Sequence, residues 1–204
     1  MSKEKFSCAI LAGGQSRRFG SDKTVATIKG VTFTEILAKK LINLSDDVMV
    51  VSKNSNKFQF NYKEVRFIED ETSKQSPLVG IVTALSNALH ETTFIVAADT
   101  PFLSQELVSY LWEQTSGYEI TVTKTLEKIN TLFGFYHRRV LNTFKANIAD
   151  GNYKLIDIYP ALNVNILDDI DILRQHDPDL MSFFNINSRE DYAKALAKCN
   201  KMSF

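Results

Sequence analysis

The chain has 204 residues, of which 44% are hydrophobic, and we expect residues 1–204 to form one domain with a sizeable core. Its 24 lysines and arginines balance 24 aspartates and glutamates, so neither nucleic acid nor a membrane surface is an expected partner. No apolar run approaches the roughly 20 residues that span a bilayer, no signal peptide is expected, and Cys8 and Cys199 form no metal or disulfide pattern, which favours a cytoplasmic protein.

Before Gly117 the chain alternates short apolar runs with segments of helical periodicity. Such alternation predicts an α/β fold of the Rossmann-like kind, with a mostly parallel central sheet and helices on both faces. The predicted strands are 7–11, 47–52, 64–68 and 93–98, and the predicted helices are 34–44, 78–89 and 104–114, the last with Ser104 as its N-cap.

After Gly117 the pattern changes. Strands are predicted at 120–125 and 132–137, separated by a polar turn at 126–131, which indicates a small antiparallel element at the edge of the sheet. The remaining predictions are a helix at 141–149 that ends before Gly151, a helical turn at 154–159, strands at 163–167 and 183–186, and a helix at 188–198 that begins with a capping box.

A glycine-rich basic loop follows the first strand, with the sequence LAGGQSRRFGSDK at residues 11–23. Glycines let backbone N–H groups approach phosphate oxygens, and the arginines and lysine can neutralise their charge, so the loop predicts a polyphosphate site. Neither the P-loop spacing nor the dinucleotide fingerprint fits it. The alternative is an ordinary strand-to-helix turn with a solvated basic face.

Acidic residues follow two of the predicted strands, and ligands of open α/β sheets bind at the carboxyl ends of strands. Asp99 stands directly after a buried strand and before a Thr-Pro turn, where it could hold Mg²⁺, although it could also be a turn-forming Asp. Asp70 is a second candidate, with Glu69 as the competing acid and a solvated acidic loop as the alternative.

Two further segments are candidate ligand contacts. The stretch 76–80 is unusually apolar and could form a wall against a flat base, or Pro77 could simply start a helix. The amides of Asn185 and Asn187 could position a metal or sugar hydroxyls, or Asn187 could only precede a helix N-cap.

Taken together, these motifs resemble those of the molybdenum cofactor guanylyltransferases, the MobA family. The loop at 11–23, IED at 68–70, PLVG at 77–80, ADTPF at 98–102 and FNIN at 184–187 occur in the family's order over nearly the whole chain. The Asp22-Lys23 ending is the most discriminating part. The resemblance implies transfer of GMP from GTP to molybdopterin carrying molybdenum, with Mg²⁺ as cofactor and release of pyrophosphate.

The family's residue roles carry over to the matching positions. Arg18, Lys23 and Asp99 would be catalytic, with Asp99 as the Mg²⁺ ligand, and GTP would be bound by Leu11, Ala12, Gly13, Lys23, Asp70 and Asp99. Base or acceptor contacts are expected from Ser52, Asn54, Pro77, Leu78, Gly80, Asn185 and Asn187. Ser52 stands where the family usually has an Asn, and Asn130-Thr131 stand where relatives often have His-Pro.

Alternative functions are a nucleotidyltransferase that uses CTP or a different phosphorylated acceptor, and a pterin- and nucleotide-binding adaptor without catalysis. The retained Lys23 and Asp99 argue against the adaptor. Expected partners are GTP, the molybdopterin cofactor and molybdoenzyme chaperones, and the protein is expected to be a monomer.

Overall fold

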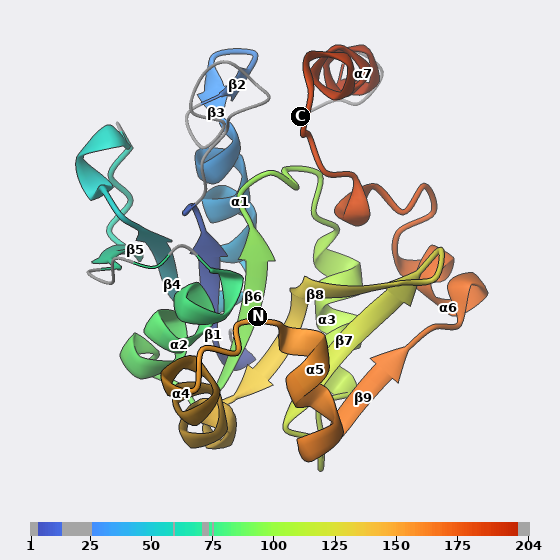
Figure 1. The fold of residues 1–204 in the computed structure, drawn as a ribbon. Helices are drawn as coiled ribbons and strands as arrows, with labels where there is room; N and C mark the ends of the chain where they lie inside the picture. Colours follow the sequence, from blue (N-terminus) through green and yellow to red (C-terminus); the bar gives the residue numbers. More distant parts are fainter. Residues whose placement is uncertain (1–3, 14–25, 59, 71–73, 75, 200–204) are drawn as a thin grey trace.

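The computed structural model describes residues 4–13, 26–58, 60–70, 74 and 76–199 (Figure 1). Within these residues a seven-stranded sheet has the order β5-β4-β1-β6-β8-β7-β9. All neighbouring strands are parallel except β8, which is antiparallel to β6 and β7. The strands are β1 (Glu4–Leu11), β4 (Ser45–Ser52), β5 (Val65–Glu69), β6 (Thr92–Ala97), β7 (Ile120–Thr125), β8 (Lys128–His137) and β9 (Val164–Leu167).

Helices cover both faces of the sheet, as the sequence predicts. Successive side chains of a strand point to opposite faces, and β1 shows this, because Cys8 and Ile10 belong to one buried cluster while Ala9 and Leu11 belong to the other. The first cluster is closed by α1 (Phe33–Leu41), α3 (Gln105–Glu113) and α6 (Ile170–His176). The second is closed by α2 (Pro77–Asn87), α4 (Leu141–Ala149) and α5 (Leu155–Ile158).

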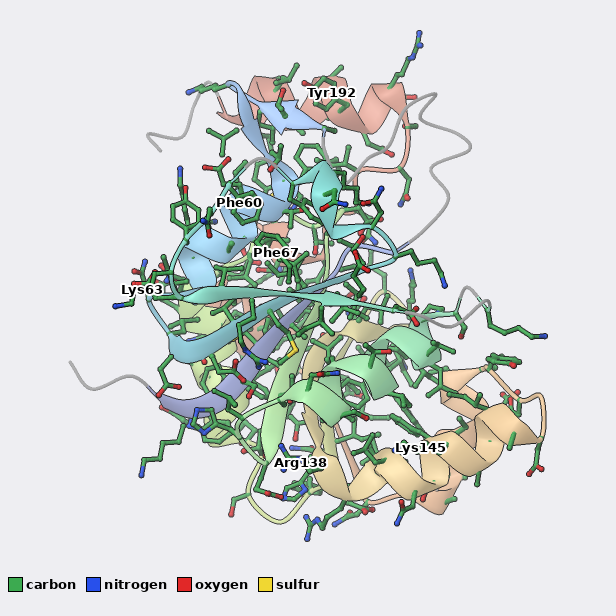
Figure 2. All side chains as sticks on the ribbon, turned by 90° about the vertical axis from the view of Figure 1, so that its left-hand side faces the viewer. Phe60, Lys63, Phe67, Arg138, Lys145 and Tyr192 are labelled. Carbon is green, nitrogen blue, oxygen red and sulfur yellow. The ribbon has the colours of Figure 1, made fainter. Side chains whose placement is uncertain are left out.

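A third, smaller cluster lies beyond the carboxyl end of β1, at the top of Figure 1. It joins the antiparallel pair β2 (Thr27–Ile28) and β3 (Val31–Thr32), the start of α1, and α7 (Arg189–Cys199). Tyr192, labelled in Figure 2, donates its hydroxyl to the Thr27 carbonyl oxygen at 2.5 Å. This contact links the last described helix to the segment that follows the glycine-rich loop.

Aromatic rings pack between α1 and the outer strands β4 and β5. Figure 2 shows Phe60 and Phe67 side by side, with ring centroids 5.5 Å apart, and Phe58 stacks on Phe67 at 5.6 Å. The chain between β4 and β5, which includes the short 3₁₀ turn η2 (Ser55–Lys57), is thereby fixed to the core.

Side-chain caps explain where several helices begin. Ser104 accepts a hydrogen bond from the Leu107 N–H at 3.2 Å, which confirms it as the N-cap of α3. The Ser188 and Asp191 side chains each accept a hydrogen bond from the other residue's N–H, which confirms the capping box of α7. Gly151 takes a φ of +77° just past α4, a conformation that costs glycine little.

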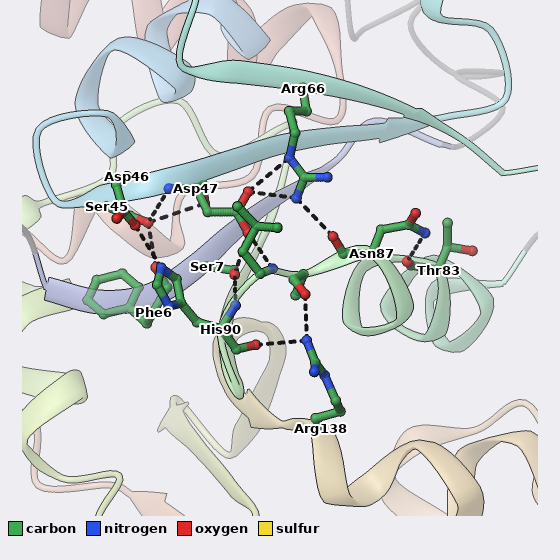
Figure 3. A network of polar contacts seen from close by, with 12 residues as sticks. Phe6, Ser7, Ser45, Asp46, Asp47, Arg66, Thr83, Asn87, His90 and Arg138 are labelled. Carbon is green, nitrogen blue, oxygen red and sulfur yellow. Dashed lines mark hydrogen bonds and ion pairs between the residues drawn. The ribbon is translucent and has the colours of Figure 1, made fainter.

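At the amino ends of the strands a buried carboxylate ties three of them together (Figure 3). Asp47 of β4 accepts hydrogen bonds from the Ser7 hydroxyl of β1 at 2.5 Å and from the Arg66 guanidinium of β5 at 2.6 Å. It also accepts one from the Leu89 N–H at 2.8 Å. This network fixes the end of the sheet opposite to the carboxyl ends of the strands.

Some sequence predictions differ from the structure. The polar stretch 126–131 is not a turn, because only Leu126 and Glu127 turn and β8 already begins at Lys128. Its antiparallel strand lies inside the sheet, and β9 forms the edge. The predicted strand 183–186 is wrong, since this segment leaves the 3₁₀ turn η5 (Met181–Phe183) without pairing into the described sheet. The short strands β2 and β3 and the helix α6 were not predicted, and neither were the 3₁₀ turns η2 and η5.

Two other 3₁₀ turns, η3 (Arg138–Val140) and η4 (Tyr159–Ala161), precede α4 and follow α5. Within the described part of the chain, every helix is too short or too polar to cross a membrane.

Candidate functional site

A cavity of about 480 Å³ lies at the carboxyl ends of β1, β4, β5 and β6 and at the beginning of β8. Ligands of open α/β sheets bind at this edge. Most of the site residues predicted from the sequence line it: Leu11, Ala12, Gly13, Ser52, Asp70, Pro77, Gly80, Asp99 and Asn185. These predicted residues come from six separate stretches of the chain, and four of the stretches are ends of parallel strands, which finish at the same edge.

One side of the cavity is formed by the ends of β4 and β5. The Asp70 N–H donates to the Ser52 carbonyl oxygen at 2.9 Å, which extends the pairing of the two strands by one residue. The Ser52 hydroxyl bonds to the backbone of Asn54, donating to its carbonyl oxygen at 3.2 Å and accepting from its N–H at 3.3 Å. Its hydroxyl therefore shapes the turn after β4. The Lys53 ammonium lies 3.6 Å from Asp70 Oδ2.

The end of β1 forms the floor next to that side. The Ala12 N–H donates to the Val51 carbonyl oxygen at 2.8 Å, and Lys57 Nζ donates to the Ala12 carbonyl oxygen at 3.3 Å. Gly80, in the first turn of α2, packs closely on Leu11, since a Cβ at Gly80 would lie 3.4 Å from Leu11 Cδ1. These contacts fix the backbone from which the glycine-rich loop departs.

Asp99 stands at the centre of the cavity edge, two residues after the end of β6. A tight turn holds it, in which the Thr100 hydroxyl donates to the Ala97 carbonyl oxygen at 2.8 Å. The Ile186 N–H donates to the Asp99 carbonyl oxygen at 2.9 Å. That bond brings the segment containing Asn185 beside Asp99, although the two residues are far apart in the sequence.

The donor set at this place suits Mg²⁺. Asp99 offers a carboxylate whose Oδ1 is buried, and Asn185 offers an exposed amide on the same cavity. Mg²⁺ prefers oxygen ligands and is commonly held by one or two carboxylates together with substrate phosphates and water. Across the described residues there is no cluster of three or more His, Cys, Asp or Glu side chains that could form a complete metal cage, so a magnesium ion here would need oxygens from a ligand.

The opposite wall is the beginning of β8, from Lys128 to Phe133. The Asn130 amide donates to the hydroxyls of Thr125 and Thr123 on β7, at 3.0 and 3.2 Å. Behind the wall, the Tyr136 hydroxyl donates to the Thr131 carbonyl oxygen at 2.6 Å and lies 2.8 Å from the Tyr159 hydroxyl.

Burial keeps this tyrosine pair un-ionised. It raises the pKa of Tyr159 to about 12 and raises the pKa of Tyr136 well above its usual value. Both hydroxyls therefore stay protonated even in alkaline solution, where an exposed tyrosine would begin to ionise.

Three predicted contact residues are not among the residues that line the cavity. Leu78 is fully buried in the core beneath α2, so its side chain cannot contact a ligand. Asn54 is exposed, and its side-chain oxygen accepts the Asn56 N–H at 3.0 Å. Asn187 is also exposed and donates its N–H to Asp191 at 3.0 Å, at the start of α7. Arg18 and Lys23 lie outside the described residues.

Asn130, noted above as standing where relatives often have His-Pro, also lines the cavity, and three further lining residues were not predicted from the sequence: Lys53, Thr100 and Lys128. Lys53 and Thr100 each stand next to a predicted residue at a strand end, and this adjacency was the signal that could have found them. Lys128 was hidden because its polar stretch looked like a loop.

A mostly parallel α/β sheet with a cavity at the carboxyl ends of its strands is typical of nucleotide-binding enzymes. The sequence profile described as "MobA-like NTP transferase domain" matches residues 8–163. The chain belongs to this family of nucleotidyltransferases.

Individual relatives agree with this assignment. A probable molybdenum cofactor guanylyltransferase of Natranaerobius thermophilus is 33% identical over 196 residues, which cover 94% of this chain and 95% of the relative. A molybdenum cofactor guanylyltransferase of Desulfosudis oleivorans is 33% identical over 190 residues, covering 92% and 93%.

Solved structures share the fold. Molybdopterin-guanine dinucleotide biosynthesis protein A of Archaeoglobus fulgidus superposes with a TM-score of 0.84 at 27% identity, covering 97% of this chain and 100% of that one. 2-C-methyl-D-erythritol 4-phosphate cytidylyltransferase of Thermus thermophilus has a TM-score of 0.71 at 14% identity, a likeness of fold alone.

Proposed function

We propose that the protein transfers GMP from GTP to molybdopterin carrying molybdenum, forming the guanine dinucleotide cofactor and releasing pyrophosphate. The observation that carries this proposal is the position of Asp99 after β6, between the side of the cavity formed by β1, β4 and β5 and the separate wall formed by β8. Two ligands can thus meet at one carboxylate. The names of the relatives, guanylyltransferases of the molybdenum cofactor, supply the identities of the two substrates.

In the proposed reaction, an oxygen of the acceptor's phosphate attacks the α-phosphorus of GTP. The bond from that phosphorus to the bridging oxygen of the β-phosphate breaks, and pyrophosphate leaves with the electron pair. The acceptor is already an anionic nucleophile, so no covalent enzyme intermediate is required. Catalysis then depends on the alignment of the two substrates and on stabilisation of the charge that develops.

Different residues would bind the nucleotide, the metal ion and the acceptor. The backbone of Leu11, Ala12 and Gly13 would bind the nucleotide, and Asp70 would contact it beside Pro77 and Gly80. Asp99, with the Asn185 amide nearby, would hold Mg²⁺, which when bound supplies positive charge to the phosphate oxygens. From the family resemblance, Arg18 and Lys23 would hold the triphosphate and stabilise the departing pyrophosphate. Lys128 and Asn130 would face the acceptor.

The test is an assay of the purified protein with Mg²⁺, molybdenum-loaded molybdopterin and either GTP, CTP or ATP. We expect pyrophosphate release and a guanine dinucleotide product, detected by chromatography, that require both GTP and the acceptor. A product with CTP in place of GTP would identify a cytidylyltransferase. Binding of the substrates with no pyrophosphate release would identify an adaptor, and either result would overturn the proposal.

We also propose that the protein acts as a monomer in the cytoplasm and passes its product to molybdoenzyme chaperones. Light scattering after gel filtration tests the first point, since a dimer would elute with twice the 23.1 kDa mass of the chain.

A further inference from the structure

Lys53 and Asp70 are the first residues after two neighbouring strands. The strand register pairs Ser52 with Glu69, so the residues that follow them also lie side by side. Lys53 Nζ is 3.6 Å from Asp70 Oδ2, and the two side chains are 29% and 10% exposed. Both line the cavity, and so do Pro77 and Gly80 of α2, the helix that packs against β4 and β5. A cation and a carboxylate are thus presented together beside a surface suited to a flat ring.

Stability alone does not account for this pair. Both charges are largely withdrawn from water, and the cost of removing them from water offsets most of the attraction between them, so such a pair adds little to stability. The neighbouring cation, Lys57, donates instead to the Ala12 carbonyl oxygen. Among the described residues that line the cavity, the only other lysine is Lys128, which belongs to the β8 wall.

The chemistry of the pair matches one edge of guanine. That edge presents an acceptor, O6, followed by two donors, N1–H and the 2-amino group. An ammonium beside a carboxylate presents the complement, a donor followed by two acceptor oxygens. Cytosine and adenine present an amino group next to an unprotonated ring nitrogen. In the same orientation that ring nitrogen would face a carboxylate oxygen with no proton between the two atoms. Guanine can therefore use all three contacts, whereas the other bases cannot.

We propose that Lys53 is a specificity residue, which donates to O6 of guanine while Asp70 accepts from N1–H and the 2-amino group. This inference rests on the proposed function, in which the nucleotide is GTP. The inference adds Lys53, which follows the position where the family usually has an Asn. It also means that two side chains, and not backbone groups alone, select the base.

Binding of nucleotide analogues without the acceptor tests the inference. Calorimetry would compare GTP with 6-thio-GTP, in which a weak sulfur acceptor replaces O6, and with ITP, which lacks the 2-amino group. A hydrogen bond to a charged group changes affinity by about tenfold or more. We therefore expect the wild-type protein to bind 6-thio-GTP and ITP each about tenfold more weakly than GTP.

Substitutions of Lys53 and Asp70 distinguish the contributions of the two side chains to base selection. In Lys53→Met, the preference for GTP over 6-thio-GTP should fall to less than about threefold, while the preference over ITP persists. In Asp70→Asn, the preference over ITP should fall. Lys53→Arg should restore part of the preference over 6-thio-GTP. Lys154→Met is the matched control, because Lys154 pairs with Asp157 at 2.9 Å on the surface and lies away from the cavity.

Three outcomes would overturn the inference. The first is an unchanged preference over 6-thio-GTP in Lys53→Met with normal thermal unfolding. The second is weaker binding of 2′-deoxy-GTP than of GTP by the wild-type protein, together with equal binding of the two nucleotides by Asp70→Asn. That result would show that the pair contacts the ribose. The third is tighter binding of CTP than of GTP by the wild-type protein, which would overturn the proposed function as well. Since no outcome depends on turnover, GTP binding without transfer would contradict only the proposed function.

Discussion

At the scale of single residues, Asp99 combines a fixed backbone with a carboxylate on the cavity. Its carbonyl oxygen accepts the Ile186 N–H, and the turn that contains it is closed by the hydrogen bond from the Thr100 hydroxyl to the Ala97 carbonyl oxygen. Neither bond uses the carboxylate group. A change of the side chain therefore leaves these two hydrogen bonds in place.

We expect Asp99→Ala to lower the rate of guanylyl transfer by about 10²–10³-fold or more, the effect of losing one electrostatic contact at a transition state. Its unfolding midpoint should stay close to that of the wild type. Pyrophosphate release and urea denaturation measure the two quantities. Asp168→Ala, an exposed position outside the cavity, is the control and should keep full activity. Near-wild-type transfer by Asp99→Ala would contradict the assignment of this residue.

Asp47 is important for stability, at the opposite end of the sheet. Its side chain is 1% exposed and joins β1, β4 and β5 through Ser7 and Arg66. Removing one partner of such a buried network leaves the other polar groups buried without it.

We expect Asp47→Ala to lower the free energy of unfolding by about 3 kcal/mol, measured by urea denaturation. Asp46→Ala is a matched control, because Asp46 is 63% exposed and pairs with His90 on the surface, a kind of contact worth less than about 1 kcal/mol. The folded fraction of Asp47→Ala should keep its transfer activity. Equal unfolding midpoints for the two variants would show that the network is not stabilising.

At the scale of elements, the β7–β8 hairpin has an unfavourable turn. Leu126 and Glu127 both have positive φ, at 46° and 62°, and Leu126 is 96% exposed. Two-residue turns of this kind favour Asn-Gly, because other side chains are strained in the left-handed region.

We expect the double substitution Leu126→Asn and Glu127→Gly to stabilise the protein by about 1 kcal/mol and to raise Tm by about 2–4 °C. The lost ion pair between Lys124 and Glu127 should matter little, since the Glu127 side chain is 93% exposed. Differential scanning calorimetry checks the shift. A lower Tm would mean that the exposed leucine has a stabilising contact in solution.

This hairpin also shows what the sequence could predict about the elements. Buried strands were found because each contains a continuous apolar run, such as 94–97 in β6, and α3 and α7 because side-chain caps mark their starts. The first half of β8 was missed, because its polar residues pair with threonines of β7 instead of facing a core. The opposite error, at 183–186, arose because apolar residues of an irregular segment pack into buried clusters without pairing in the sheet.

The candidate site was predictable where it follows the strands. Asp70 and Asp99 were found because the carboxyl ends of parallel strands share one edge. The β8 wall was not predictable. An antiparallel strand places its beginning at that edge, and a local sequence pattern does not show in which direction a strand will run. The side chain of Leu78 lies in the core and not on the cavity, because successive side chains at a helix start point in different directions, so any contact of this residue with a base would come from its backbone.

At the scale of the whole molecule, ligand binding should stabilise the fold, because the cavity joins residues from most of the strands. GTP with Mg²⁺ at about one hundred times its Kd should add about 2.7 kcal/mol. For a chain of this size Tm should then rise by about 5–10 °C. Thermal shift assays with GTP, CTP and ATP at equal concentration measure the effect. A larger shift with CTP would contradict selection of guanine.

The reversed direction of β8 has a consequence for how such an enzyme can change. Its beginning, not its end, borders the cavity, and its tip is exposed at Leu126. Lengthening an exposed tip costs little loop-closure entropy. Insertions between Thr125 and Lys128 would extend this wall while leaving β1, β6 and Asp99 in place. Relatives that differ in the length of this one hairpin would therefore accept different ranges of acceptors and still catalyse the same transfer reaction.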